Sequence, residues 1–261
     1  MSFLDRFEER GFLTLTGLFD ANYVDALRGE YQSQFEQFSA ERGKDFGMKV
    51  GQRRFMLPIR LRGPFLESKI YAHPLVLGIV REFLGPDFLI DNIICICALP
   101  GAELQHLHAD HPDLFPETPT ARETLRPYGV VLSIPLVELP PTTGTTKLYV
   151  GSHKSAAEDH TEMPYLAKGD CFLFDFRIRH QGTENRSGEQ RPVVYICYTR
   201  RWFTDLENFK AHGRINIDAA DLAAIPVEHR PLFRRLAAKG AFDRTESTLF
   251  ADWQRQVLAL G

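Results

Sequence analysis

The stretch Leu89-Ile90-Asp91-Asn92-Ile93-Ile94-Cys95-Ile96-Cys97-Ala98 opens a region in which short apolar segments alternate with turn residues. Four further segments of this kind follow: Gly129–Val137, Lys147–Val150, Cys171–Phe176 and Val193–Tyr198. Several short strands separated by Gly and Pro are typical of a β-sandwich or barrel. Because helix-like segments lie on both sides, the order of elements favours a mainly-β fold, an eight-stranded double-sheet jelly roll with flanking helices.

The flanking segments carry helical periodicity. From residue 21 to about residue 38, apolar side chains recur at three- and four-residue steps after Asp20, which is a favourable N-cap residue. A second helix is predicted for Pro74–Leu84, closed at Gly85. Helical character returns in the C-terminal part, most clearly in two segments: Asp218–Ala224 and Arg230–Ala238.

Two histidine–carboxylate pairs follow the first strand, His108-Ala109-Asp110 and His111-Pro112-Asp113. A pair at i, i+2 shares one face only in an extended strand, and Pro112 removes a backbone donor there. We therefore expect the metal ligands to be His108 and Asp110. His180, far downstream, is the expected third ligand, because two imidazoles and one carboxylate form the facial triad of non-haem Fe(II) oxygenases.

Arg191 follows His180 by 11 positions, which allows a strand end, a turn and a return strand. A guanidinium pairs two carboxylate oxygens at once, which suits the distal carboxylate of a dicarboxylate co-substrate. Together with the triad, Arg191 predicts a 2-oxoglutarate-dependent oxygenase. Read without a metal, Asp110 would be an ion-paired loop carboxylate and Arg191 a surface arginine after a turn.

Several longer motifs occur in order along the chain. They are Phe7-Glu8-Glu9-Arg10-Gly11-Phe12-Leu13, Phe83-Leu84-Gly85-Pro86-Asp87, Gln105-His106-Leu107-His108-Ala109-Asp110, Thr143-Gly144-Thr145-Thr146, Gly151-Ser152-His153-Lys154 and Gly169-Asp170-Cys171-Phe172-Leu173-Phe174-Asp175. With these motifs the chain resembles the phytanoyl-CoA dioxygenase family of Fe(II)/2-oxoglutarate oxygenases, from about Phe3 to about Tyr198. Several motifs in the right order are much more specific than any one of them.

The resemblance implies a double-stranded β-helix, the cupin-like jelly roll, and a need for Fe(II), 2-oxoglutarate and O2. It also implies that Thr146 adds a hydroxyl to the carboxylate held by Arg191 and that Gln105 contacts the co-substrate. The expected reaction is hydroxylation, or another oxidation, of an unactivated C–H bond in a small organic substrate, with release of succinate and CO2. Because a halogenase needs the position of Asp110 free of a carboxylate, halogenation is not expected.

Two positions depart from the family's N-G-x-T and P-G-S-H-K segments. Thr143 stands where the family has Asn, and Val150 stands where it has Pro. Neither is an expected ligand, so the departures concern loop geometry and not metal binding. His106 and His111 are expected at the rim of the site at most, and His153 is expected to fix a loop.

Two other functions remain open at this stage. The first is a jelly-roll metal-dependent hydrolase or isomerase, since two histidines and a carboxylate also bind zinc. Such an enzyme would have no use for Arg191 behind the metal. The second is a non-catalytic metal-binding relative, whose signature would be a lost ligand, and none is lost among His108, Asp110 and His180.

The substrate could carry an anionic group. Phe55, Leu57, Ile59 and Leu61 alternate as one apolar face, which leaves three arginines on the other face of the predicted strand: Arg54, Arg60 and Arg62. If this strand lines the barrel mouth, its basic face would meet a carboxylate or phosphate. The alternative is a solvated strand face, which such a pattern more often forms.

Composition bounds the remaining classes. The formal charge of −3 gives no general attraction to nucleic acid, no apolar run approaches the ~20 residues that span a bilayer, and the acidic start does not resemble a signal peptide. All four cysteines lie in apolar segments without C-x-x-C spacing, which predicts buried free thiols and a cytoplasmic location. We expect residues 1–261 to form one oxygenase domain: 1–88 as helical support with the first strands, 89–200 as the jelly-roll core, and 201–261 as a C-terminal helical segment. The oligomeric state is left open.

Overall fold

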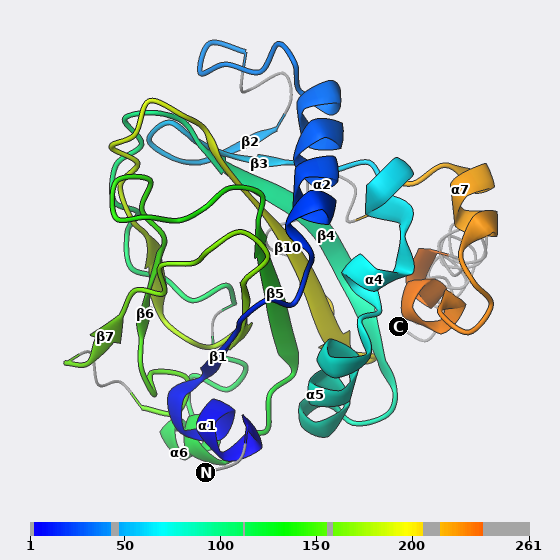
Figure 1. Ribbon diagram of the computed structural model, residues 1–261. Helices are drawn as coiled ribbons and strands as arrows, with labels where there is room; N and C mark the ends of the chain where they lie inside the picture. Colours follow the sequence, from blue (N-terminus) through cyan, green and yellow to red (C-terminus); the bar gives the residue numbers. More distant parts are fainter. Residues whose placement is uncertain (1–2, 43–46, 112, 156–158, 206–214, 237–261) are drawn as a thin grey trace, which may run out of the picture.

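The computed structural model describes residues 3–42, 47–111, 113–155, 159–205 and 215–236. Seven strands form a large antiparallel sheet in the order β1-β8-β5-β10-β4-β3-β2 (Figure 1). Their bounds are β1 Phe12–Leu15, β2 Met48–Gly51, β3 Arg54–Leu57, β4 Phe88–Ala98, β5 Gly129–Pro135, β8 Cys171–Asp175 and β10 Arg191–Arg200.

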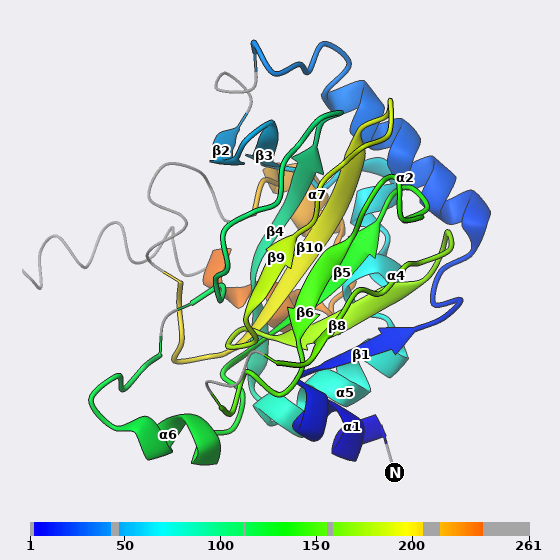
Figure 2. The ribbon, with the colours of Figure 1, turned by 90° about the vertical axis from the view of Figure 1, so that its left-hand side faces the viewer.

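A second, antiparallel sheet has the order β7-β6-β9. Its strands are β6 Thr146–Tyr149, β7 Thr161–Glu162 and β9 His180–Gly182. Figure 2 looks onto this small sheet, with β5, β10 and β4 of the large sheet behind it. Two facing antiparallel sheets form the double-stranded β-helix, so the predicted fold class is confirmed.

The five strands predicted between residues 89 and 198 are all present, and their bounds differ from the prediction by at most two residues. The strand predicted around residues 54–62 is present as β3 but ends at Leu57. Side chains along β10 alternate between the two faces of the large sheet. Val194 and Ile196 point into the outer core, whereas Val193, Tyr195 and Cys197 point into the space between the sheets. The inner face of the large sheet therefore forms one wall of the cavity between the sheets.

Helices cover the outer face of the large sheet (Figure 1). They are α1 Phe3–Arg10, α2 Ala21–Gln34, α4 Ser68–Tyr71 and α5 Pro74–Leu84, with the 3-10 turn η1 Gly63–Leu66 between them; α6 Pro119–Thr124 lies apart (Figure 2). Asp20 caps α2 as predicted, since its side chain accepts a 2.8 Å hydrogen bond from the backbone N–H of Asn22. The sequence predicted that this helix continues to about residue 38, but α2 ends at Gln34. Beyond it Phe35 and Phe38 leave the helical path and pack as neighbouring rings in the core.

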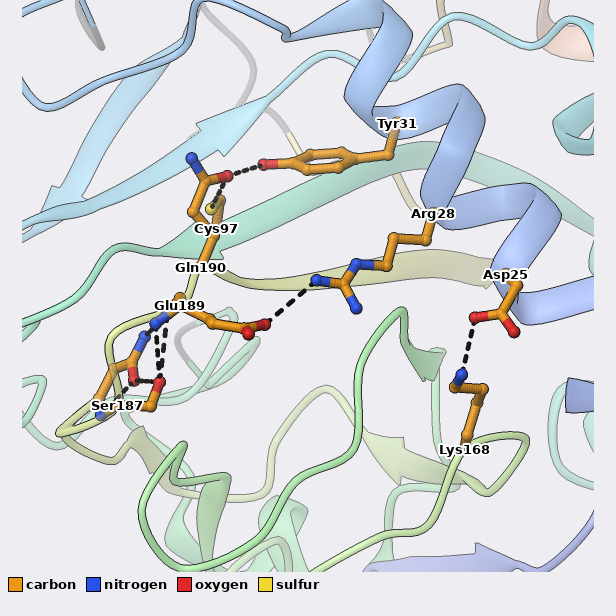
Figure 3. A network of polar contacts seen from close by, with 9 residues as sticks. Asp25, Arg28, Tyr31, Cys97, Lys168, Ser187, Glu189 and Gln190 are labelled. Atoms are coloured by element: carbon orange, nitrogen blue, oxygen red, sulfur yellow. Dashed lines mark hydrogen bonds and ion pairs between the residues drawn. The ribbon is translucent and has the colours of Figure 1, made fainter.

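Polar contacts attach α2 to loops of the barrel (Figure 3). Lys168 donates to Asp25 over 2.7 Å, and Arg28 donates to Glu189 over 3.2 Å. The Tyr31 hydroxyl donates to the Gln190 side chain over 3.0 Å. Because Gln190 directly precedes β10, these contacts fix the start of the strand that carries Arg191.

The C-terminal part is only partly described. The predicted helix at 218–224 is present as α7 Ala219–Ala224. The predicted helix at 230–238 begins instead as the 3-10 turn η2 Arg230–Phe233 and continues helically to residue 236, where the described part ends. No helix among the described residues has the length and apolarity needed to cross a bilayer. The four cysteines are free and buried, as predicted.

Candidate active site

His108, Asp110 and His180 come together between the two sheets. One ligand atom of each lies within 4.8 Å of those of the other two, and Asp110 Oδ1 is 3.5 Å from His180 Nε2. His180 begins β9, the later strand that was expected to carry it. His108 was expected at the end of a strand, but it forms only an isolated bridge to His180, with backbone hydrogen bonds of 3.2 and 2.7 Å.

Both imidazoles are oriented through their Nδ1 atoms. His108 Nδ1 lies 2.9 Å from the carbonyl of His106, and His180 Nδ1 lies 3.1 Å from the carbonyl of Ile178. A carbonyl accepts only from a protonated nitrogen, so Nε2 of each ring keeps its lone pair for a metal. Burial, together with neighbouring His180, lowers the pKa of His108, which also favours the neutral ring. These donors fit a divalent metal bound by two imidazoles and one carboxylate.

The second histidine–carboxylate pair takes no part in this cluster. His111 packs against the ring of Phe203 with centroids 4.8 Å apart, and Asp113 pairs with Arg122 over 3.6 Å. His106, as expected, is an exposed residue at the rim of the cavity. His153 is buried and its Nε2 contacts the carbonyl of Glu8 over 3.0 Å, so it fixes a loop as expected.

Two buried arginines lie side by side at one end of the cavity. Arg191 on β10 and Arg54 on β3 both lie opposite Ala98 of the intervening strand β4. The two residues are 3% and 2% exposed, respectively. Both donate to the carbonyl of Thr183 over 2.9 Å, and Arg191 also donates to the carbonyl of Thr143 over 2.7 Å. Burial and the nearby Arg191 lower the pKa of Arg54 to about 10.

The structure gives neither guanidinium a carboxylate partner within its described part. Two buried cations without a counter-ion are unfavourable unless an anion joins them. The arginine pair therefore fits a carboxylate ligand with one negative end placed between Arg54 and Arg191.

Two glycines make room for these arginines. A Cβ on Gly144 would lie 2.5 Å from Arg191 Nη1, and φ at Gly144 is +74°. A Cβ on Gly182 would lie 2.6 Å from Arg54 Nη1 and 2.4 Å from Gln105 Oε1. The loop at residues 143–144 holds Arg191 through its backbone, because Arg191 donates to the carbonyl of Thr143. The Asn that the family has at position 143 is therefore not needed to hold Arg191.

Thr146 is buried and lines the cavity beside Tyr195. Tyr195 follows Arg191 by four residues on the same face of β10. Burial raises the pKa of its phenol, and the charges of Arg191 and Asp110 also act on that pKa. Tyr195 therefore lies between the arginine end and the metal cluster, a place for which no residue was predicted from the sequence. Alternation along β10 was the signal that could have placed it there.

Gln105 also lines the cavity, and both ends of its amide bind backbone groups. Its Oε1 accepts from the N–H of Gly182 over 3.0 Å, and its Nε2 donates to the carbonyl of Val50 over 2.9 Å. The Gln105 side chain thus accepts the hydrogen bond from Gly182 that a backbone carbonyl would accept in a regular strand pair next to His108. This substitution explains why His108 belongs to an isolated bridge and not to a regular strand.

The predicted basic face of Arg54, Arg60 and Arg62 is wrong for two of its members. Arg60 pairs with Asp218, and Arg62 pairs with Glu30 over 2.6 Å; neither lines the cavity. The strand ends at Leu57, after which the chain leaves the sheet, so alternation no longer sets where the arginines point. Arg54, inside β3, is the only one of the three that reaches the site.

The cavity around these groups has a volume of about 540 Å³. The arginine pair lies at one end and the metal cluster lies further along. Much of the wall between and beyond them is apolar: Met56, Ile94, Ile96, Leu139, Phe172, Phe176 and Val193. A site of this size and lining suits a small molecule whose skeleton is mostly hydrophobic.

A jelly roll that presents two histidines and a carboxylate to an internal cavity is the architecture of non-haem iron oxygenases. Residues 7–193 match the family model "Phytanoyl-CoA dioxygenase (PhyH)", and the chain belongs to that family. It is a 2-oxoglutarate-dependent non-haem iron dioxygenase, which uses Fe(II), 2-oxoglutarate and O2.

Among curated proteins, the chain is similar to "Dioxygenase trt7" of Aspergillus terreus (strain NIH 2624 / FGSC A1156), with 24% identity over 194 residues, 70% of this chain and 68% of that protein. Among solved structures, it is similar to HygX from Streptomyces hygroscopicus with nickel, 2-oxoglutarate and hygromycin B bound. That match has a TM-score of 0.59 and 16% identity and covers 82% of this chain and 96% of that one. The α-ketoglutarate-dependent epimerase SnoN from nogalamycin biosynthesis matches with a TM-score of 0.56 and 16% identity, over 76% of this chain and 80% of that one. At such identities the solved structures support the fold alone.

Proposed function

We propose that His108, Asp110 and His180 hold Fe(II), and that Arg191 and Arg54 hold the distal carboxylate of 2-oxoglutarate. The observation that carries this proposal is the pair of buried guanidinium groups, both bonded to the Thr183 carbonyl and without a carboxylate partner in the described structure. A jelly-roll hydrolase or isomerase would gain nothing from two such cations. The arginine pair therefore favours the oxygenase.

Thr146 and Gln105 are proposed to complete the co-substrate site. Thr146 lines the cavity beside Tyr195, which is close to the charge of Arg191. From that position it can donate to a carboxylate oxygen. Gln105 uses its amide to hold Gly182 and Val50, so its contact with the co-substrate would come from the one N–H that remains.

The reaction is proposed to be the hydroxylation, or another oxidation, of an unactivated C–H bond in a small and mostly apolar substrate. When bound, iron and 2-oxoglutarate supply dioxygen activation coupled to decarboxylation to succinate and CO2. The protein's residues position the reactants and surround them. The two Nδ1–H groups fix the imidazoles, the arginines align the co-substrate, and the apolar walls exclude water. Asp110 fills the position that a halide would need, so oxygenated or desaturated products are expected in place of halogenated ones.

The test is the visible charge-transfer band that forms when 2-oxoglutarate chelates ferrous iron under anaerobic conditions. Arg191→Ala should weaken 2-oxoglutarate binding by about 2–4 kcal/mol, the usual cost of truncating one side of a charge-assisted pair, while Fe(II) affinity barely changes. Arg186→Ala is the matched control, because that side chain is 75% exposed and pairs only at the surface with Glu184. A band that forms in Arg191→Ala at wild-type concentrations of 2-oxoglutarate would refute the assignment.

A further inference from the structure

The end of the cavity away from the arginines is shaped by a β-bulge in β4. Cys197 of β10 lies opposite Asn92, but the next residue, Tyr198, lies opposite Ile90, so Asp91 is the extra residue of the bulge. Bulges next to active sites re-aim side chains and are retained features of a fold. This one lies six residues along β10 from Arg191, roughly 20 Å at the usual strand rise, and beyond Tyr195.

Asp91 is a buried carboxylate that holds its surroundings in place. It accepts from the Thr204 hydroxyl over 3.2 Å and from the Asn92 amide nitrogen over 3.3 Å, and it pairs with Arg235. The contact with Asn92 fixes which end of that amide is the donor. The amide oxygen, Oδ1, is therefore the atom left to meet a ligand.

Asn92 Oδ1 is buried without a hydrogen-bond donor among the described residues, although Asn92 is only 1% exposed and lines the cavity. A buried acceptor without a donor costs free energy, and such groups call for an explanation in a native protein. Asp205 follows Thr204 directly, is 4% exposed, and lines the same cavity. This end of the cavity thus offers an amide oxygen and a carboxylate, both of which are acceptors.

We propose that Asn92 and Asp205 form the subsite that selects the substrate, by accepting hydrogen bonds from a hydroxyl or a protonated amine on an otherwise apolar skeleton. This rests on the proposed function, which places the co-substrate at the arginine end. The two ends of the cavity are then opposite in character, with cationic donors at one and acceptors at the other. A substrate carboxylate is disfavoured at the acceptor end, and 2-oxoglutarate is directed to Arg54 and Arg191.

The experiment uses the anaerobic enzyme loaded with Fe(II) and 2-oxoglutarate, and follows the shift of the charge-transfer band as a probe enters the cavity. The probes share one apolar cage and differ in one group: 1-adamantanol, 1-methoxyadamantane, 1-adamantylamine and 1-adamantanecarboxylate. The alcohol and the amine should bind about tenfold to a hundredfold more tightly than the ether and the carboxylate, the range expected for a hydrogen bond to a polar or charged acceptor.

Two variants assign the preference to these residues. Asp205→Asn should remove most of the preference for the amine, and Asn92→Leu should bring the alcohol and the ether to similar affinities. Both variants should keep the wild-type titration with 2-oxoglutarate. Asp113→Asn is the matched control, because Asp113 pairs with Arg122 outside the cavity, and it should leave the ranking of the probes unchanged.

The proposal is overturned if the carboxylate binds best, if no probe shifts the band, or if the ranking survives in both Asp205→Asn and Asn92→Leu. Failure of the proposed function looks different. In that case the wild-type enzyme would form no charge-transfer band with Fe(II) and 2-oxoglutarate, before any probe is added.

Discussion

Asp110 and Asp113 lie three positions apart, yet only Asp110 has its carboxylate beside two imidazoles. Asp110→Ala should remove detectable Fe(II) binding, because the two histidines alone lack the carboxylate that completes the three-ligand facial triad. Asp113→Ala should bind Fe(II) as the wild type does, since it loses only a surface pair with Arg122. Anaerobic titration with Fe(II) separates the two, and equal loss of iron in both variants would contradict the assignment.

Most of the candidate site could be predicted from the sequence at the scale of single residues. The triad and Arg191 follow from residue types and spacing, and the structure brings all four to one cavity. Arg54 was predicted to meet a substrate anion, and its place beside Arg191 was missed. The two arginines become neighbours only because β3 and β10 pair with β4 on either side of Ala98. The order of strands in a sheet cannot be predicted from the local periodicity of the sequence.

At the scale of elements, the three-residue strand β9 positions both the metal cluster and the arginine pair. Gly182→Ala should cost about 1–3 kcal/mol of unfolding free energy, the usual range for overpacking, and should weaken 2-oxoglutarate binding, because its Cβ would displace Gln105 or Arg54. Gly188→Ala is the control: nothing lies within 4 Å of its Cβ, so its stability should be unchanged or raised by up to about 1 kcal/mol. Urea denaturation measures the first effect, and the charge-transfer titration measures the second. Equal behaviour of the two variants would show that Gly182 is not a close-approach site.

The accuracy of the strand predictions depends in part on strand length. The five segments read as strands are long enough for several apolar residues to mark them, and each is present. Strands β7 and β9 were missed and have two or three residues, which is too short for a period of two to be recognised. Strands β1 and β2 were not located either, although they have four residues each, the same length as β6. β9 exists because backbone partners at His108 and Leu148 are brought to it by the rest of the fold.

At the scale of the whole molecule, the C-terminal segment is attached to the large sheet through a buried charge. Arg235→Ala should cost about 3–5 kcal/mol of unfolding free energy, because it breaks an ion pair of the Asp91 carboxylate, whose side chain is fully buried. Arg234→Ala should cost about 0–1 kcal/mol, since its partner Asp87 is half exposed. Midpoints of urea denaturation give the comparison, and similar shifts for the two variants would mean that residues 230–236 are not anchored through Asp91.

The expectation that residues 1–261 form a single domain remains a prediction, as does a cytoplasmic location. The contacts of Arg235 with Asp91 and of Arg60 with Asp218 support the first, because they join segments far apart in the sequence. Residues 237–261, which include the end of the predicted C-terminal helix, lie outside the described part of the chain.

The alternation of side chains along the strands also sorts the four thiols into two chemical environments. Cys95, Cys97 and Cys171 belong to the outer core beneath the helices, whereas Cys197 lies on the cavity floor opposite Asn92. An enzyme that activates dioxygen without a substrate in place exposes its own lining to oxidation, and thiols are among the first side chains to react. Damage from such idle turnover would therefore begin at Cys197, within the chamber where the substrate should have been, while the other three sulfurs stay protected until the fold opens.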